Sequence, residues 1–91
     1  MINFNQLRYF VEVAETHSFT KASENLFITQ PSLSVSIQKL EENLGVKLIN
    51  RGKHMILTSS GQCLLEHSKA ILAEVELVQR KLCQKSENKN T

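Results

Sequence analysis

Apolar residues in the first half of the chain recur at the spacing of amphipathic helices. A first helix is predicted from about residue 5 to 16, because four apolar residues follow the i, i+3, i+4 and i+7 pattern: Leu7, Phe10, Val11 and Ala14. Asn3 or Asn5 can cap this helix. Ser18 can cap a short second helix over FTKASENL, in which the small Ala22 and Ser23 allow another helix to approach closely.

A third helix is predicted over residues 30–44. Thr29 can cap it, and Pro31 lies in its first turn, where the missing N–H costs nothing. Its apolar residues form one stripe that we expect to be buried: Leu33, Ile37, Leu40 and Leu44. Gly45 suits the position that ends such a helix.

After Gly45 the pattern changes to that of a small hairpin. Residues 47–50 and 54–57 are short β-compatible runs on either side of a basic turn. Thr58 can then cap a last helix of about 25 residues, to roughly residue 85, with polar residues fraying behind it. This order of elements is typical of a winged helix-turn-helix. The sequence therefore predicts a mainly α fold with three parts. Residues 1–58 form a winged helix-turn-helix of three helices and a small β-hairpin wing. Residues 59–85 form a long C-terminal dimerisation helix, and residues 86–91 form a disordered polar tail.

Composition and charge narrow the class of protein. The chain has 91 residues with one proline, three glycines and 5% aromatic residues, which fits one small helical domain and excludes the multidomain layout of most enzymes. Its net charge is only +2. No acidic residue occurs in residues 25–40 or 43–63, however, and the second stretch carries Lys47, Arg51, Lys53 and His54. These two stretches are the expected positive surface, which includes a basic wing over residues 50–54.

The sequence contains no recognisable signal for export or membrane insertion. Its N-terminus lacks a basic segment followed by an apolar one, and no apolar run approaches the length of a membrane span. We therefore expect a cytoplasmic protein without a membrane partner. Cys63 and Cys83, on one helix, would lie about 30 Å apart, too far for a bridge within the chain, so we expect reduced thiols.

The polar face of the third helix carries the chemistry of base recognition. Counting about 100° per residue leaves this face opposite the buried stripe. It comprises Pro31, Ser32, Val35, Gln38, Lys39 and Glu42, with Gln30 at the tip. Gln30 and Gln38 can each read adenine through two hydrogen bonds, and Val35 can touch a thymine methyl group. Ser32, Ser34 and the free N–H groups of the first turn suit phosphate oxygens.

A single glutamine on such a face is more often only solvated. The combination with a basic, acid-free hairpin directly after the helix indicates instead that helix and wing straddle one phosphate backbone. We therefore expect double-stranded DNA binding, with a recognition helix over residues 30–44 in the major groove and the wing on the backbone or in the minor groove. The expected contact residues are Gln30, Pro31, Ser32, Ser34, Val35, Gln38, Lys39, Arg51, Lys53 and His54.

Motifs across about two thirds of the chain strengthen this expectation. The segments QLRYFVEVAE, SFTKASENLFITQPSLS, KLEENLGVKL, NR and ILTSSG follow one another at fixed spacing. In this the chain resembles, nearly without gaps, the N-terminal DNA-binding domain of LysR-type transcriptional regulators. The resemblance implies a transcriptional regulator in which Gln30, Ser32 and Ser34 are groove and phosphate residues, and Arg51 is the wing arginine. It also implies that the last helix is the family's linker helix, through which two chains dimerise on a dyad-symmetric site.

The chain departs from this family pattern at two positions and in one region. Val35 stands where many members carry an arginine on the groove face, and Ser36 where they often carry glutamine. The target preference is therefore expected to differ. The family's effector-binding domain has no counterpart in this sequence, so we expect no small-molecule effector site in the chain.

An enzyme would need a constellation of reactive side chains. Glu41 and Glu42 are adjacent and point about 100° apart on a helix, so they cannot serve one substrate as an acid and base pair, and we expect them to be solvated or paired with lysines. Cys63 and His67 make at most half of a zinc site. We therefore expect no catalytic residues, no metal and no cofactor. The alternative function is a protein-protein interaction or dimerisation module that acts through the C-terminal helix.

The last helix carries the pattern of a dimer seam. Its apolar positions alternate in steps of four and three, with one polar member: Leu64, Ser68, Ile71, Val75, Val78 and Leu82. Antiparallel pairing about Ala73 would set each member against its mirror position in a second chain and would bring Cys63 near Cys83 of that chain. Leu65 and Leu72 form a second apolar ridge, so we expect part of this helix to pack on its own winged domain.

Overall fold

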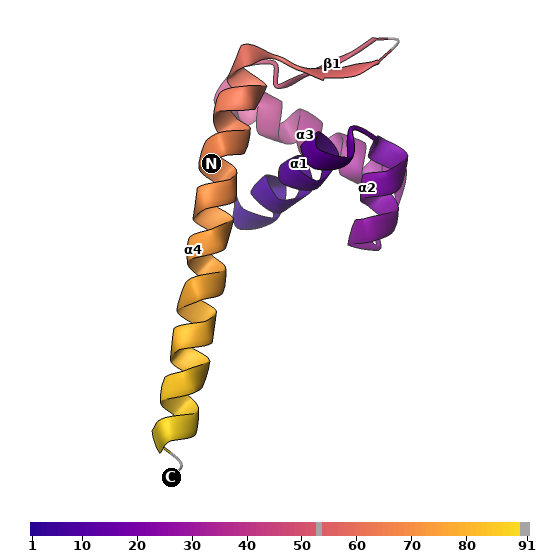
Figure 1. The fold of residues 1–91 in the computed structure, drawn as a ribbon. Helices are drawn as coiled ribbons and strands as arrows, with labels where there is room; N and C mark the ends of the chain where they lie inside the picture. Colours follow the sequence, from indigo (N-terminus) through magenta and orange to yellow (C-terminus); the bar gives the residue numbers. More distant parts are fainter. Residues whose placement is uncertain (53, 90–91) are drawn as a thin grey trace.

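Three short helices gather beside the first half of a much longer fourth helix, and a hairpin lies at the end of the molecule where that helix begins (Figure 1). The computed structural model describes residues 1–52 and 54–89, and for residues 85–89 it describes only the backbone. The elements are, in chain order, α1 (Phe4–Thr16), α2 (Phe19–Leu26), α3 (Gln30–Leu44), β1 (Ile49–Arg51), β2 (Met55–Leu57) and α4 (Ser59–Lys89). The predicted mainly α fold, with a small hairpin and a long C-terminal helix, is confirmed.

The helices begin and end at the residues whose side chains suit those positions. The side chain of Asn3 accepts the N–H of Gln6, and the side chain of Gln6 accepts the N–H of Asn3, so Asn3 and not Asn5 caps α1. Ser18 and Thr29 cap α2 and α3, each by accepting the N–H of the third residue that follows. Gly45 ends α3 in the left-handed region, as predicted.

The core lies between the three short helices and the start of the hairpin. The predicted stripe of α3 supplies its centre, with Leu33, Ile37 and Leu40 fully buried and Leu44 packed at their edge. Around them lie the buried apolar residues of the other elements: Phe10, Val13, Ala14, Ala22, Leu48 and Ile49. Because this stripe is buried, the opposite face of α3 is fixed toward solvent.

The hairpin is shorter than predicted and is tied to the helices at both ends. Its strands pair antiparallel with Ile49 opposite Leu57 and Arg51 opposite Met55. Residues 47, 48 and 54, expected in the strands, lie outside them. Thr58 caps α4 through the N–H of Gly61, and its own N–H bonds the carbonyl of Leu48.

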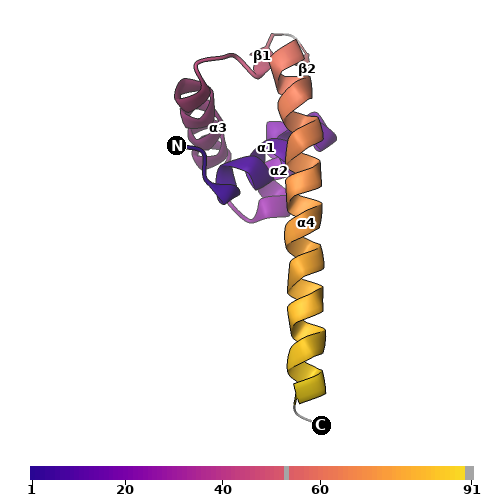
Figure 2. The same cartoon turned by 90° about the vertical axis from the view of Figure 1, so that its left-hand side faces the viewer.

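Helix α4 is the longest element and projects beyond the rest of the molecule (Figure 2). Its 31 residues span about 46 Å at 1.5 Å per residue. It ends at Lys89, four residues later than predicted, and Asn90 and Thr91 of the expected polar tail lie outside the described residues. The first half packs on the domain, where an ion pair of 3.3 Å joins Lys69 to Glu15 of α1. No helix in the described part of the chain is long and apolar enough to cross a membrane.

Candidate nucleic-acid interface

The outward face of α3 presents the predicted contact residues to solvent. Val35 lies at its centre and is 48% exposed. The other members of the predicted face are exposed as well: Pro31, Ser32, Gln38, Lys39 and Glu42. An exposed helix face of short polar and small apolar side chains has the size and chemistry that a major groove admits.

The tip of α3 is held by the helix that precedes it. The hydroxyl of Thr20 in α2 donates to the Oε1 atom of Gln30 at 3.3 Å. At the same tip, the Thr29 hydroxyl accepts the N–H of Ser32 and donates to the Ser32 Oγ atom. The tip therefore offers an oriented amide and a hydroxyl with a free proton.

The hairpin arginine is anchored to α3 rather than free in solvent. Nη1 of Arg51 donates to Oγ of Ser34 at 2.6 Å, and Nη2 reaches the Ser34 carbonyl at 3.5 Å. The guanidinium also lies 4.4 Å from the centre of the Phe19 ring, a cation–π contact with α2. The sequence predicted Arg51 and Ser34 as separate DNA contacts. It predicted neither the hydrogen bond between them nor the contact of Arg51 with Phe19.

Of the other two predicted contact residues in the wing, His54 is described by the structure and Lys53 is not. His54 is exposed at the turn of the hairpin, as expected for a contact residue. Lys53 lies outside the described residues. The described basic surface of the wing therefore consists of Arg51 and His54.

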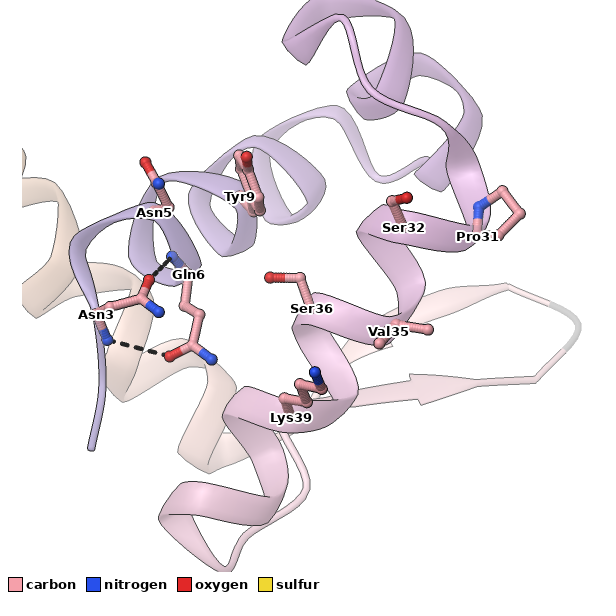
Figure 3. Close-up of a pocket in the computed structure, with 9 residues that line it drawn as sticks. All are labelled: Asn3, Asn5, Gln6, Tyr9, Pro31, Ser32, Val35, Ser36 and Lys39. Atoms are coloured by element: carbon pink, nitrogen blue, oxygen red, sulfur yellow. Dashed lines mark hydrogen bonds between the residues drawn. The ribbon is translucent and has the colours of Figure 1, made fainter.

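A cleft of about 530 Å³ lies between α1 and α3 (Figure 3). It is lined by nine residues: Asn3, Asn5, Gln6, Tyr9, Pro31, Ser32, Val35, Ser36 and Lys39. We call it the α1–α3 cleft. None of these lining residues is acidic, and Lys39 contributes a positive charge. The α1 side of this cleft was not predicted from the sequence, because polar residues near the start of a helix do not indicate that they face another helix.

One carboxylate of α3 is structural, and its predicted surroundings were wrong. Glu41 is buried, and its Oε2 atom accepts the N–H groups of Leu48 and Ile49 at 2.8 and 3.2 Å. This fixes the start of β1 against α3. The neighbouring Glu42 is exposed, as expected.

Helix α4 divides the predicted dimer seam into a covered and a free part. Ser68 is fully buried within its own chain, so it cannot contact a second chain as predicted, and Leu64 packs against its own core. Val75 is half-buried beside α1. The remaining seam members, Ile71, Val78 and Leu82, are exposed, and so is Leu77.

The cysteines and histidines do not come together as a metal site. Cys63 and His67 are both exposed on α4. Within the described residues, no group of three or more His, Cys, Asp or Glu side chains is placed to hold a metal ion.

Residues 4–62 match the model of a family described as bacterial regulatory helix-turn-helix protein, lysR family. The chain belongs to this LysR family. It is 49% identical over 72 residues to a probable RuBisCO transcriptional regulator of Thalassiosira pseudonana, an alignment that covers 78% of this chain and 24% of that protein. It is 45% identical over 76 residues to the Hca operon transcriptional activator HcaR of Escherichia coli (strain K12), covering 82% and 26% of the two chains.

A solved LysR-family structure has the same fold. The crystal structure of the BenM DNA-binding domain with catB site 1 DNA superposes with a TM-score of 0.91 and 37% identity, over 93% of this chain and 97% of that one. BenM is an HTH-type transcriptional regulator of Acinetobacter baylyi. The relatives of this LysR-family chain are thus transcriptional regulators and not enzymes.

The chain spans about a quarter of the length of the curated relatives it matches. The family match runs from the start of α1 into the first turn of α4. It therefore includes α3, the hairpin and all of the α1–α3 cleft except Asn3, whereas the exposed part of α4 lies beyond it.

Proposed function

We propose that this LysR-family chain binds double-stranded DNA sequence-specifically, as the DNA-binding part of a transcriptional regulator. The exposed face of α3 carries the proposal. It combines amides at Gln30 and Gln38 with an exposed valine, while the helix is held in place by a buried stripe behind it. Membership of a family of regulators, and a fold shared with a domain crystallised on DNA, support the same conclusion.

In this function α3 occupies the major groove and the hairpin follows the adjoining backbone or minor groove. Gln30 and Gln38 hydrogen-bond to base edges. The donor and the acceptor of each side-chain amide match the acceptor and the donor that adenine presents in the major groove. The Ser32 hydroxyl, at the start of α3, holds a phosphate oxygen. Arg51, already oriented by Ser34, adds a positive charge without the cost of ordering a free side chain.

We further propose that two chains bind together through α4, on a dyad-symmetric DNA site. Ile71, Val78 and Leu82 expose large apolar side chains along one face of a helix that projects past the domain (Figure 2). A second copy of this face would cover them in an antiparallel pair, which is an isologous contact. The cytoplasm is the compartment that fits this function.

Selection of bound sequences from a random duplex pool tests the proposed function. A single recovered consensus with two inverted half-sites is the expected outcome. About four phosphate contacts per chain, eight per dimer, predict a slope near −7 for log K against log salt concentration. A flat salt response, or no enrichment after selection, would contradict DNA binding.

The exposed apolar face of α4 also fits the second candidate, a protein-protein interaction module. Light scattering and oxidative cross-linking separate it from the homodimer. A homodimer is expected at micromolar concentration by light scattering, and mixed Cys63 to Cys83 cross-links after mild oxidation would indicate antiparallel pairing about Ala73. A monomer that binds no DNA would favour the interaction module instead.

A further inference from the structure

The α1–α3 cleft and the hairpin lie on opposite flanks of the outward face of α3. Ser34, which binds Arg51 of β1, precedes Val35, and Ser36, which lines the cleft, follows it. At about 100° per residue these two serines project to either side of Val35. Figure 3 shows Ser36 turned toward Tyr9 of α1 and Val35 turned away from it.

A helix in a major groove meets a phosphate backbone on each side. The groove is about 12 Å wide and an α-helix with its side chains is about 10 to 12 Å across, so little room remains at either flank. With the hairpin on one strand, the other strand runs past the side of α3 that faces α1. The cleft lies on that side.

We propose that the α1–α3 cleft binds the phosphodiester backbone of the DNA strand opposite the one met by the hairpin. This inference rests on the proposed function and adds residues of α1 to the binding surface. The backbone is held by Lys39, by the hydroxyls of Tyr9, Ser32 and Ser36, and by the amide of Asn5.

The donors of the cleft are free to serve an anion. The Ser32 Oγ atom accepts from Thr29, which leaves the Ser32 proton available. The Oδ1 atom of Asn5 accepts from Arg8 at 3.2 Å, so the NH₂ group of that amide is the part left for a ligand. Within the described chain, no hydrogen bond occupies the Tyr9 or Ser36 hydroxyl, and no carboxylate lines the cleft. Several free donors with a cation and without a competing acid favour phosphate.

Single-atom changes in the cleft test the inference. Tyr9→Phe and Ser36→Ala each remove one hydroxyl and keep the apolar packing, and each should weaken binding to the selected duplex roughly ten-fold with the consensus unchanged. Lys39→Gln should lower the salt slope by about 0.9 per chain. Lys81→Gln, at an exposed position of α4, is the matched control and should leave affinity unchanged.

Duplexes with one uncharged methylphosphonate locate the contact. A neutral linkage at the phosphate in the cleft should weaken binding by the wild-type protein and should abolish the further effect of Tyr9→Phe. Wild-type affinity and salt slope in all three cleft variants would overturn the inference and leave DNA binding intact. A changed consensus in these variants would also overturn it, because the cleft would then read bases. Failure of the wild-type protein to select any DNA would instead overturn the proposed function itself.

Discussion

The guanidinium of Arg51 donates to the hydroxyl of Ser34 at 2.6 Å, across the junction between the hairpin and the outward face of α3. Two residues that are 17 positions apart in the chain therefore form one polar surface. With the Phe19 ring also 4.4 Å from its guanidinium, Arg51 is oriented before any ligand arrives. The hairpin and the helix are thus expected to meet DNA as a unit.

Removing this arginine should weaken binding to all duplexes alike. If Arg51 contacts a phosphate, Arg51→Ala removes no base contact, so affinity for the selected site and for a scrambled duplex should fall by a similar factor. The salt slope should fall by about 0.9 per chain. Fluorescence anisotropy at several salt concentrations measures both quantities. Arg80→Ala, at an exposed position of α4, is the control, and a changed consensus in Arg51→Ala would contradict a backbone role.

Truncating Gln30 should act on sequence choice instead. Gln30→Ala removes an amide oriented by Thr20 and should cost about 1 to 3 kcal/mol on the best site, while binding to scrambled DNA changes little. A repeated selection should show relaxed preference at one base pair per half-site. An unchanged consensus and affinity would show that Gln30 does not contact a base.

The exposed Val35 should read a thymine methyl group. Replacing the contacted thymine by uracil removes only that methyl and should weaken wild-type binding about four-fold, the value of roughly 0.8 kcal/mol for one buried carbon. In Val35→Ala the same replacement should have little effect. Binding titrations of both proteins with both duplexes measure the coupling free energy between the Val35 side chain and the thymine methyl group. Val46→Ala, at a valine of similar exposure beyond the end of α3, should keep the full wild-type response.

Local patterns predicted most of the fold, because caps and buried stripes are encoded within a few residues. Thr29, Leu33 and Gly45 were each assigned the role that they have in the structure. The Arg51 contacts and the α1–α3 cleft escaped prediction, since they depend on how distant elements approach one another. Ser68 shows the same limit, because a heptad pattern does not distinguish a partner chain from the chain's own domain.

Ser68→Ala should stabilise the protein. The Ser68 hydroxyl is fully buried, and no hydrogen-bond partner for it lies in the described part of the chain. Its removal relieves a desolvation cost and introduces the better helix former, so we expect the free energy of unfolding to rise by about 0.5 to 1.5 kcal/mol. Urea denaturation measures this change. Ala70→Ser, at an exposed position two residues later, measures the difference in helix propensity between alanine and serine alone. A destabilised Ser68→Ala protein would show that the hydroxyl has a hydrogen-bond partner.

Glu41 should be the most sensitive charged residue for stability. Its Oε2 atom accepts both the Leu48 and the Ile49 N–H groups inside the protein, so Glu41→Ala leaves two buried donors without partners and should lower the free energy of unfolding by about 2 to 4 kcal/mol. Glu41→Gln keeps an oxygen at the same place without the charge, and it should lose about half as much. Glu42→Ala, at the exposed neighbouring position, should change stability by no more than about 0.5 kcal/mol. Thermal and urea unfolding of the three variants measure this order, and equal losses for Glu41→Ala and Glu42→Ala would show that the buried carboxylate does not hold the hairpin on α3.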